Sequence, residues 1–79
     1  MTQRNMTQTE QTLVPRLDEV IDIFNAGFYA QAVELAQKLS MSNPSAWPAY
    51  EIMGAAHMCL NDKNKSIECY KRVIELNPN

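Results

Sequence analysis

Apolar side chains recur with helical spacing in four segments of this chain. In the first segment, Leu17, Val20, Ile21 and Phe24 follow the i, i+3, i+4, i+7 pattern of one face of an amphipathic helix. The later segments have apolar positions with similar spacing, carried by Ala32, Leu35, Ala36 and Leu39, then Tyr50, Met53 and Met58, then Ile67, Tyr70, Val73 and Ile74. The pattern predicts helices near 13–26, 28–41, 46–60 and 63–76.

Residues that favour turns separate these segments. Gly27 and Asn61 tolerate the left-handed backbone conformation that ends many helices. Asn43-Pro44 and Asn77-Pro78 end the other two helices, because a residue before proline is driven out of the helical region. Helix starts are predicted by Pro15 and Pro48 in first turns and by Ser45 as an N-cap. Short connections between four helices predict an antiparallel array.

The chain also repeats itself. A shift of 34 residues aligns Gly27 with Asn61, Ala32 with Ser66, Glu34 with Glu68, and Pro44 with Pro78. A helix–turn–helix unit with this period is typical of a helical repeat protein. A four-helix bundle whose periodicity is accidental is the alternative.

The second unit resembles the tetratricopeptide repeat. It reads Tyr50-x-x-Met53-Gly54-x-x-His57, then Ser66-x-x-x-Tyr70, then Pro78, whereas the first unit is degenerate. The resemblance implies an all-α fold of antiparallel helical hairpins stacked as an α-solenoid fragment. The expected organisation is a flexible polar tail at 1–11 and repeats at 12–44 and 45–79. The expected packing residues are Gly27, Ala32, Pro44, Tyr50, Met53, Gly54, Ser66, Tyr70 and Pro78.

The same resemblance implies a groove that binds another protein or a peptide. The first helices of successive repeats would line it, through Val14, Leu17, Ile21, Phe24, Pro48, Glu51, Ala55 and Met58. Leu17, Ile21 and Ile52 stand where some relatives carry the Lys and Asn that grip chaperone tails, so binding of such tails is not expected. An apolar groove of this kind suits an amphipathic helix or an apolar segment. The competing hypothesis is that the N-terminal tail or a second copy covers these side chains.

The last helix predicts self-association. Its apolar stripe is wider than one neighbouring helix can cover, and it consists of Ile67, Tyr70, Val73, Ile74 and Leu76. With an apolar first helix at the other end, the isolated chain is expected to form a homodimer or larger homo-oligomer by pairing like faces. Two functions remain open: a freestanding adaptor or scaffold, and the N-terminal extension of a larger enzyme. A weak likeness to repeats that precede bacterial glycosyltransferase or sulfotransferase domains suggests the second.

Composition excludes most other classes of function. The net charge of -2, the pI of about 5.2 and the scattered Lys and Arg argue against a nucleic-acid binder, and no apolar run is long enough to span a membrane. Cys59 and Cys69 lack a disulfide framework, which favours the reducing cytoplasm. His57 and Cys59 lie two apart on a helix and point in different directions, so they form no nucleophile–base pair. No metal, cofactor or catalytic site is therefore expected, and the chain is not predicted to be an enzyme.

Overall fold

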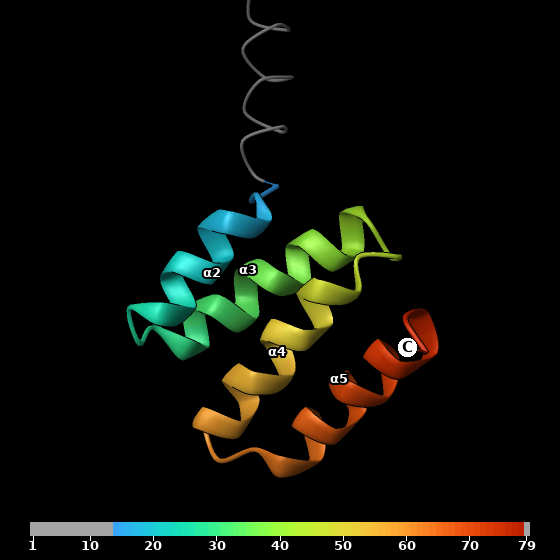
Figure 1. Ribbon diagram of the computed structural model, residues 1–79. Coiled ribbons are helices and arrows are strands. Elements are labelled where there is room, and N and C mark those ends of the chain that lie inside the picture. Colours follow the sequence, from blue (N-terminus) through green and yellow to red (C-terminus); the bar gives the residue numbers. More distant parts are fainter. Residues whose placement is uncertain (1–13, 79) are drawn as a thin grey trace, which may run out of the picture.

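The computed structural model describes residues 14–78, and within them it contains four helices and no strand. The helices are α2 (Leu17–Asn25), α3 (Tyr29–Ser42), α4 (Trp47–Cys59) and α5 (Lys63–Leu76), shown in Figure 1. The all-α helical repeat fold expected from the sequence is confirmed. The expected tail at 1–11, and residues 12, 13 and 79 of the expected repeats, lie outside the described residues.

The first helix begins later than the sequence predicted. Pro15 precedes α2 instead of lying in its first turn, because Arg16 is extended, with φ −86° and ψ 154°. Arg16 occupies the N-cap position, and its backbone N–H donates to Glu19 Oε1 at 2.8 Å. This contact satisfies one of the backbone N–H groups at the helix start, which have no partner within the helix. The prediction that Pro15 opens the helix was therefore wrong.

Left-handed residues end the first helix of each hairpin, as the sequence predicted. Gly27 has φ 90° and Asn61 has φ 66°. Ser45 is not an N-cap, because the cap position of α4 falls on Ala46, whose side chain cannot accept a hydrogen bond. Asp62 caps α5 by accepting from the Lys65 backbone N–H at 3.4 Å.

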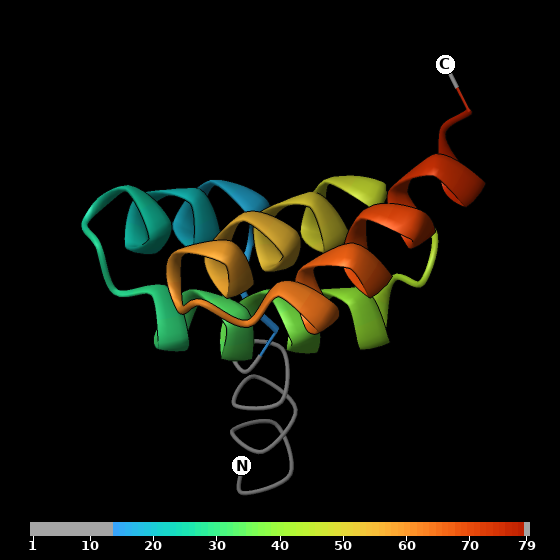
Figure 2. The same cartoon turned by 90° about the horizontal axis from the view of Figure 1, so that it is seen from below.

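The helices form two hairpins, α2 with α3 and α4 with α5. In Figure 1, α5 returns alongside α4, and α4 packs against both helices of the first hairpin. Figure 2 shows α2 and α4 side by side in one layer with α3 beneath them. The two first helices of the hairpins therefore share one face of the molecule.

Small residues dominate the core. Ala32, Ala36, Ala49 and Ala56 are fully buried, which lets neighbouring helices approach closely. Buried Val20, Ala36 and Met53, from α2, α3 and α4, form the central cluster. Around this cluster pack the partly buried side chains of Leu35, Leu39, Tyr50, Ile52 and Cys69. The core thus joins the two hairpins into one folding unit.

The two hairpins differ in which helix supplies the larger side chain where the helices cross. Val20 and Ala36 are both fully buried in the first hairpin. The positions 34 residues later hold Gly54 and Tyr70, so a larger residue on the second helix accompanies a smaller one on the first. Ser66 is buried at the second crossing, where its Oγ donates to the Gly54 carbonyl oxygen at 2.8 Å. Pro44 and Pro78 are exposed beyond the ends of α3 and α5.

Candidate functional site

A groove with a volume of 370 Å³ runs between α2 and α4. Its lining residues are Ile21, Phe24, Pro48, Glu51, Ile52, Ala55 and Tyr70. Phe24 is held in place by an edge-on contact with Tyr29, with ring centroids 5.3 Å apart. The walls therefore come from packed helices rather than from loops, and the groove is already open without a ligand.

Five of the eight residues expected to form a groove line this one. They are Ile21, Phe24, Pro48, Glu51 and Ala55. The other three lie elsewhere: Val14 is exposed before α2, Leu17 is half-buried at the start of α2, and Met58 is exposed near the end of α4. These three do not line the groove in this structure.

Two lining residues were not among the eight expected to form the groove, although Ile52 stands at one of the positions where some relatives grip chaperone tails. Ile52 is four residues after Pro48 and three before Ala55, so helical spacing places it on the same side of α4. That spacing could have identified it. Helical spacing within α4 could not have identified Tyr70, because Tyr70 belongs to α5. Its ring passes over Gly54, which has no side chain, and so reaches the groove.

The groove is apolar except at two side chains. Burial raises the pKa of the Tyr70 hydroxyl, and the negative charge of Glu51 raises it further. Glu51 is exposed and carries the one carboxylate in the lining. Neither histidine nor cysteine lines this groove.

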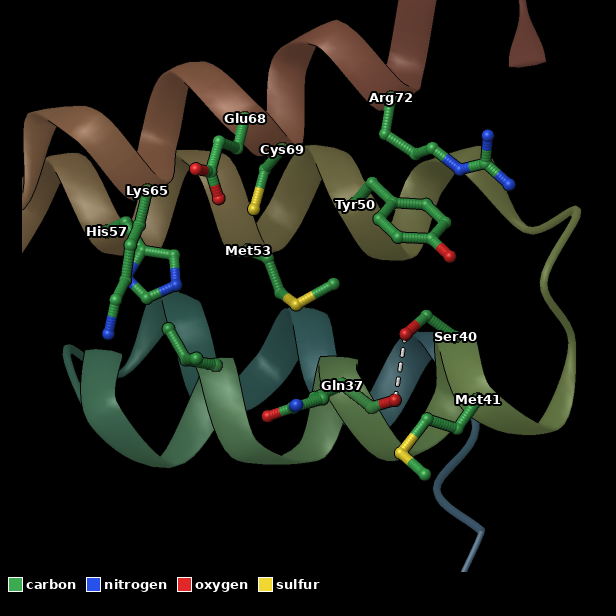
Figure 3. Close-up of a pocket in the computed structure, with 11 residues that line it drawn as sticks. Gln37, Ser40, Met41, Tyr50, Met53, His57, Lys65, Glu68, Cys69 and Arg72 are labelled. Carbon is green, nitrogen blue, oxygen red and sulfur yellow. Dashed lines mark hydrogen bonds between the residues drawn. The ribbon is translucent and has the colours of Figure 1, made fainter. Parts of the chain in front are cut away.

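A second hollow of 530 Å³ lies on the opposite side of α4 (Figure 3). It is lined by Val33, Gln37, Ser40, Met41, Tyr50, Met53, His57, Lys65, Glu68, Cys69 and Arg72. The Arg72 guanidinium stacks over Tyr50, 5.8 Å from the ring centroid. Ser40 Oγ donates to the Gln37 carbonyl oxygen at 2.8 Å, so this hydroxyl is satisfied within its own helix. The sequence analysis did not predict this hollow.

The histidine and the two cysteines do not lie together. His57 and Cys69 both line the second hollow, whereas Cys59 is exposed outside it. Both cysteines are free thiols, and burial raises the pKa of the Cys69 thiol. Among residues 14–78 there is no group of three His, Cys, Asp or Glu side chains that could hold a metal ion. None of the four described helices is long and apolar enough to cross a bilayer.

The outer face of α5 is more exposed than the matching face of α3. Ser40 is 6% exposed, but Ile74, 34 residues later, is 64% exposed. Ala36 is fully buried, whereas Tyr70 is 37% exposed. The cause is that α4 covers α3, while no described helix covers α5 in the same way. Of the five residues expected in the stripe, Ile67, Tyr70 and Ile74 are exposed and Val73 and Leu76 are half-buried.

The first helix does not offer a matching apolar face. In α4, Tyr50, Ile52 and Met53 belong to or pack against the central cluster. The residues 34 positions earlier are Arg16, Asp18 and Glu19, all exposed, and Arg16 pairs with Asp18 through Nη2 and Oδ2 at 2.6 Å. Charges therefore occupy the positions that α4 uses for docking, although Ile21 of α2 remains 39% exposed.

Comparison with known proteins adds one match. Residues 47–79, which span α4 and α5, match the family model of the tetratricopeptide repeat. Searches of curated proteins and of solved structures gave no match. The matched segment contains Gly54, Ser66 and Tyr70, which meet at the crossing of the two helices. Residues 47–79 therefore form a helical hairpin that matches the tetratricopeptide repeat.

Proposed function

We propose that the chain is an adaptor that binds an apolar segment of another protein in the groove between α2 and α4. Tetratricopeptide repeats are, in general, modules for protein–protein interaction. The observation that carries the proposal is the groove itself, in which Ile21, Phe24 and Ala55 face one another across two helices. An incoming apolar side chain would remove their remaining exposed surface from water, which is favourable by about 25 cal/mol per Å².

The proposal includes no catalytic step and no cofactor. Support comes from the groove lining, which holds neither histidine nor cysteine. We also propose that the chain works in the cytoplasm, where the free thiols of Cys59 and Cys69 would remain reduced. The alternative of an N-terminal extension of an enzyme stays a prediction that no structural observation favours.

The experiment is selection of binders from a library of displayed peptides on the immobilised chain. We expect enriched peptides with apolar residues at helical spacing, and we expect Ala55→Arg to abolish their binding, because the new side chain fills the groove. Met41→Arg is the matched control, since Met41 is exposed and lines the second hollow. Circular dichroism establishes that both variants remain helical. Enriched peptides that bind Ala55→Arg as well as the unchanged chain would contradict the proposal.

Self-association through α5 is a second candidate function. Exposure of Ile67 and Ile74 on a face whose counterpart in α3 is covered favours it. A head-to-tail contact, in which α2 of one copy covers α5 of another, would lack apolar docking side chains, because Arg16, Asp18 and Glu19 stand where α4 has Tyr50, Ile52 and Met53. A two-fold pairing of α5 with α5 avoids this conflict and gives a closed dimer.

Sedimentation tests this second candidate. We expect a dimer at high concentration, and a monomer for Ile67→Lys/Ile74→Lys, in which two exposed apolar side chains become charged. Met41→Lys is the control, because Met41 is an apolar residue outside α5 that is even more exposed than Ile67 and Ile74. A helical monomer that persists at high concentration for the unchanged chain would rule out the α5 pairing.

A further inference from the structure

Charge is distributed unevenly among the helices. The two helices that form the groove contain Asp18, Glu19, Asp22 and Glu51 and neither lysine nor arginine. By contrast, α5 contains Lys63, Lys65, Lys71 and Arg72 against Glu68 and Glu75. The groove side of the molecule is therefore acidic, although the net charge of the chain is only -2.

Most carboxylates near the start of α2 already have partners. Asp18 pairs with the Arg16 guanidinium, and Glu19 accepts from the Arg16 backbone N–H. Glu51 differs, because it forms no ion pair with any residue from 14 to 78. It also stands inside the groove lining, beside apolar Pro48 and Ala55. Among the described residues, Glu51 is therefore a negative charge without an ion-pair partner in an otherwise apolar groove.

A purely apolar ligand would bind this groove at a cost. Covering the groove removes water from the Glu51 carboxylate, and a carboxylate that loses water without gaining a partner is strongly disfavoured. Tyr70 and Glu51 both line the groove, and the pKa of the Tyr70 hydroxyl is raised by burial and then by the negative charge of Glu51. A ligand that brings a cation to Glu51 would avoid the cost.

We infer that the groove selects amphipathic segments that carry lysine or arginine beside their apolar side chains, with Glu51 as the residue that recognises the cation. This inference rests on the proposed function and names the class of ligand for the same groove. Glu51 determines specificity, and the apolar walls supply the contact area.

The test uses three synthetic helical peptides of the length of α4, 13 residues. All three carry the same leucine stripe, and the positions flanking it hold lysine, glutamine or glutamate. Binding to the full chain is measured by fluorescence anisotropy. We expect the affinity order lysine, glutamine, glutamate. Glu51→Gln should weaken the lysine peptide by about two- to five-fold, the range of an exposed ion pair, and should not weaken the glutamine peptide. Raising NaCl from about 0.05 M to about 0.5 M should weaken the lysine peptide most.

The control variant is Glu34→Gln, which removes an exposed carboxylate from α3, away from the groove. It should leave the affinity order and the lysine peptide affinity unchanged. Equal binding of all three peptides would overturn the inference while leaving the proposed function standing. The same effect from Glu34→Gln as from Glu51→Gln would assign the preference to net charge and overturn the role of Glu51. Binding of none of the peptides would count against both proposals.

Discussion

The Tyr70 ring lies directly over Gly54, at the crossing of α4 and α5. A Cβ atom on residue 54 would lie 2.9 Å from Tyr70 Cε2, 3.0 Å from Cζ and 3.1 Å from Cδ2. These distances are shorter than ordinary contact between carbon atoms. Gly54 therefore has a steric role, and the space it leaves allows Tyr70 to reach from α5 into the groove between α2 and α4.

This contact predicts that Gly54→Ala destabilises the fold. Overpacking against the Tyr70 ring costs about 1–3 kcal/mol, which outweighs the gain of about 1 kcal/mol from replacing glycine in a helix. Chemical denaturation followed by circular dichroism measures the free energy of unfolding. A more stable Gly54→Ala variant would show that the ring moves aside without cost.

The matched background is Tyr70→Ala, in which the ring is absent. There Gly54→Ala should stabilise the fold by about 0.5–1 kcal/mol, because only the helical preference of alanine remains. An alanine at 70 has a precedent in the chain, since Ala36 occupies the corresponding position beside Val20 in the first hairpin. If Gly54→Ala changed the free energy of unfolding by the same amount in both backgrounds, the two residues would not be coupled.

A second prediction concerns the hydrogen bond between Ser66 and Gly54. Ser66 is 1% exposed, and its Oγ donates to the Gly54 carbonyl oxygen at 2.8 Å. Ser66→Ala should lower the free energy of unfolding by about 0.5–1.5 kcal/mol, the usual net contribution of such a bond. Ser45→Ala is the control, because Ser45 is exposed and should tolerate the change within about 0.5 kcal/mol. Equal free energies of unfolding for Ser66→Ala and Ser45→Ala would show that the hydrogen bond makes no net contribution to stability.

A third prediction concerns the thiols. Burial raises the pKa of Cys69, so less thiolate forms at a given pH, and Cys69 also lies half-buried. Alkylation of Cys69 in Cys59→Ser should be slower than that of exposed Cys59 in Cys69→Ser. The alkylation rate of Cys69 should reach half its maximum at a pH above about 8.5, the ordinary pKa of a thiol.

The same shift affects stability at high pH. The folded state holds the Cys69 proton where the unfolded chain has released it, so stability falls as the pH rises past the ordinary thiol value. Cys69→Ser should reduce this fall. Equal alkylation rates for the two thiols at every pH would contradict the burial of Cys69.

Local sequence signals predicted the helices because those signals act within a few residues. Helical spacing identified four segments, and Gly27 and Asn61 end helices through backbone conformations that their own side chains permit. The start of α2 was wrong because it depends on the contact between Arg16 and Glu19, which competes with proline in the first turn. The geometry of the backbone at Arg16 decides where α2 begins, and the residue types alone do not determine that geometry.

The groove was harder to predict than the fold. Residues of α2 and α4 could be assigned to a shared face from spacing, but Tyr70 enters from α5 through the gap above Gly54. To predict the second hollow, one must know how α3, α4 and α5 are placed relative to one another. The periodicity within a single helix does not give this information. The charges of α2 were visible in the sequence, yet their exposure follows from packing.

The measurement that tests the central claim most directly is a titration of the isotope-labelled chain with the lysine peptide, followed by amide NMR. The account predicts that the largest shift changes fall on Ile21, Phe24, Glu51 and Ala55, with amides around Val33 and Met41 of the second hollow nearly unchanged. Ala55→Arg should suppress the changes. Shift changes centred on the second hollow, or on the outer face of α5, would contradict the claim that the groove between α2 and α4 is the binding site.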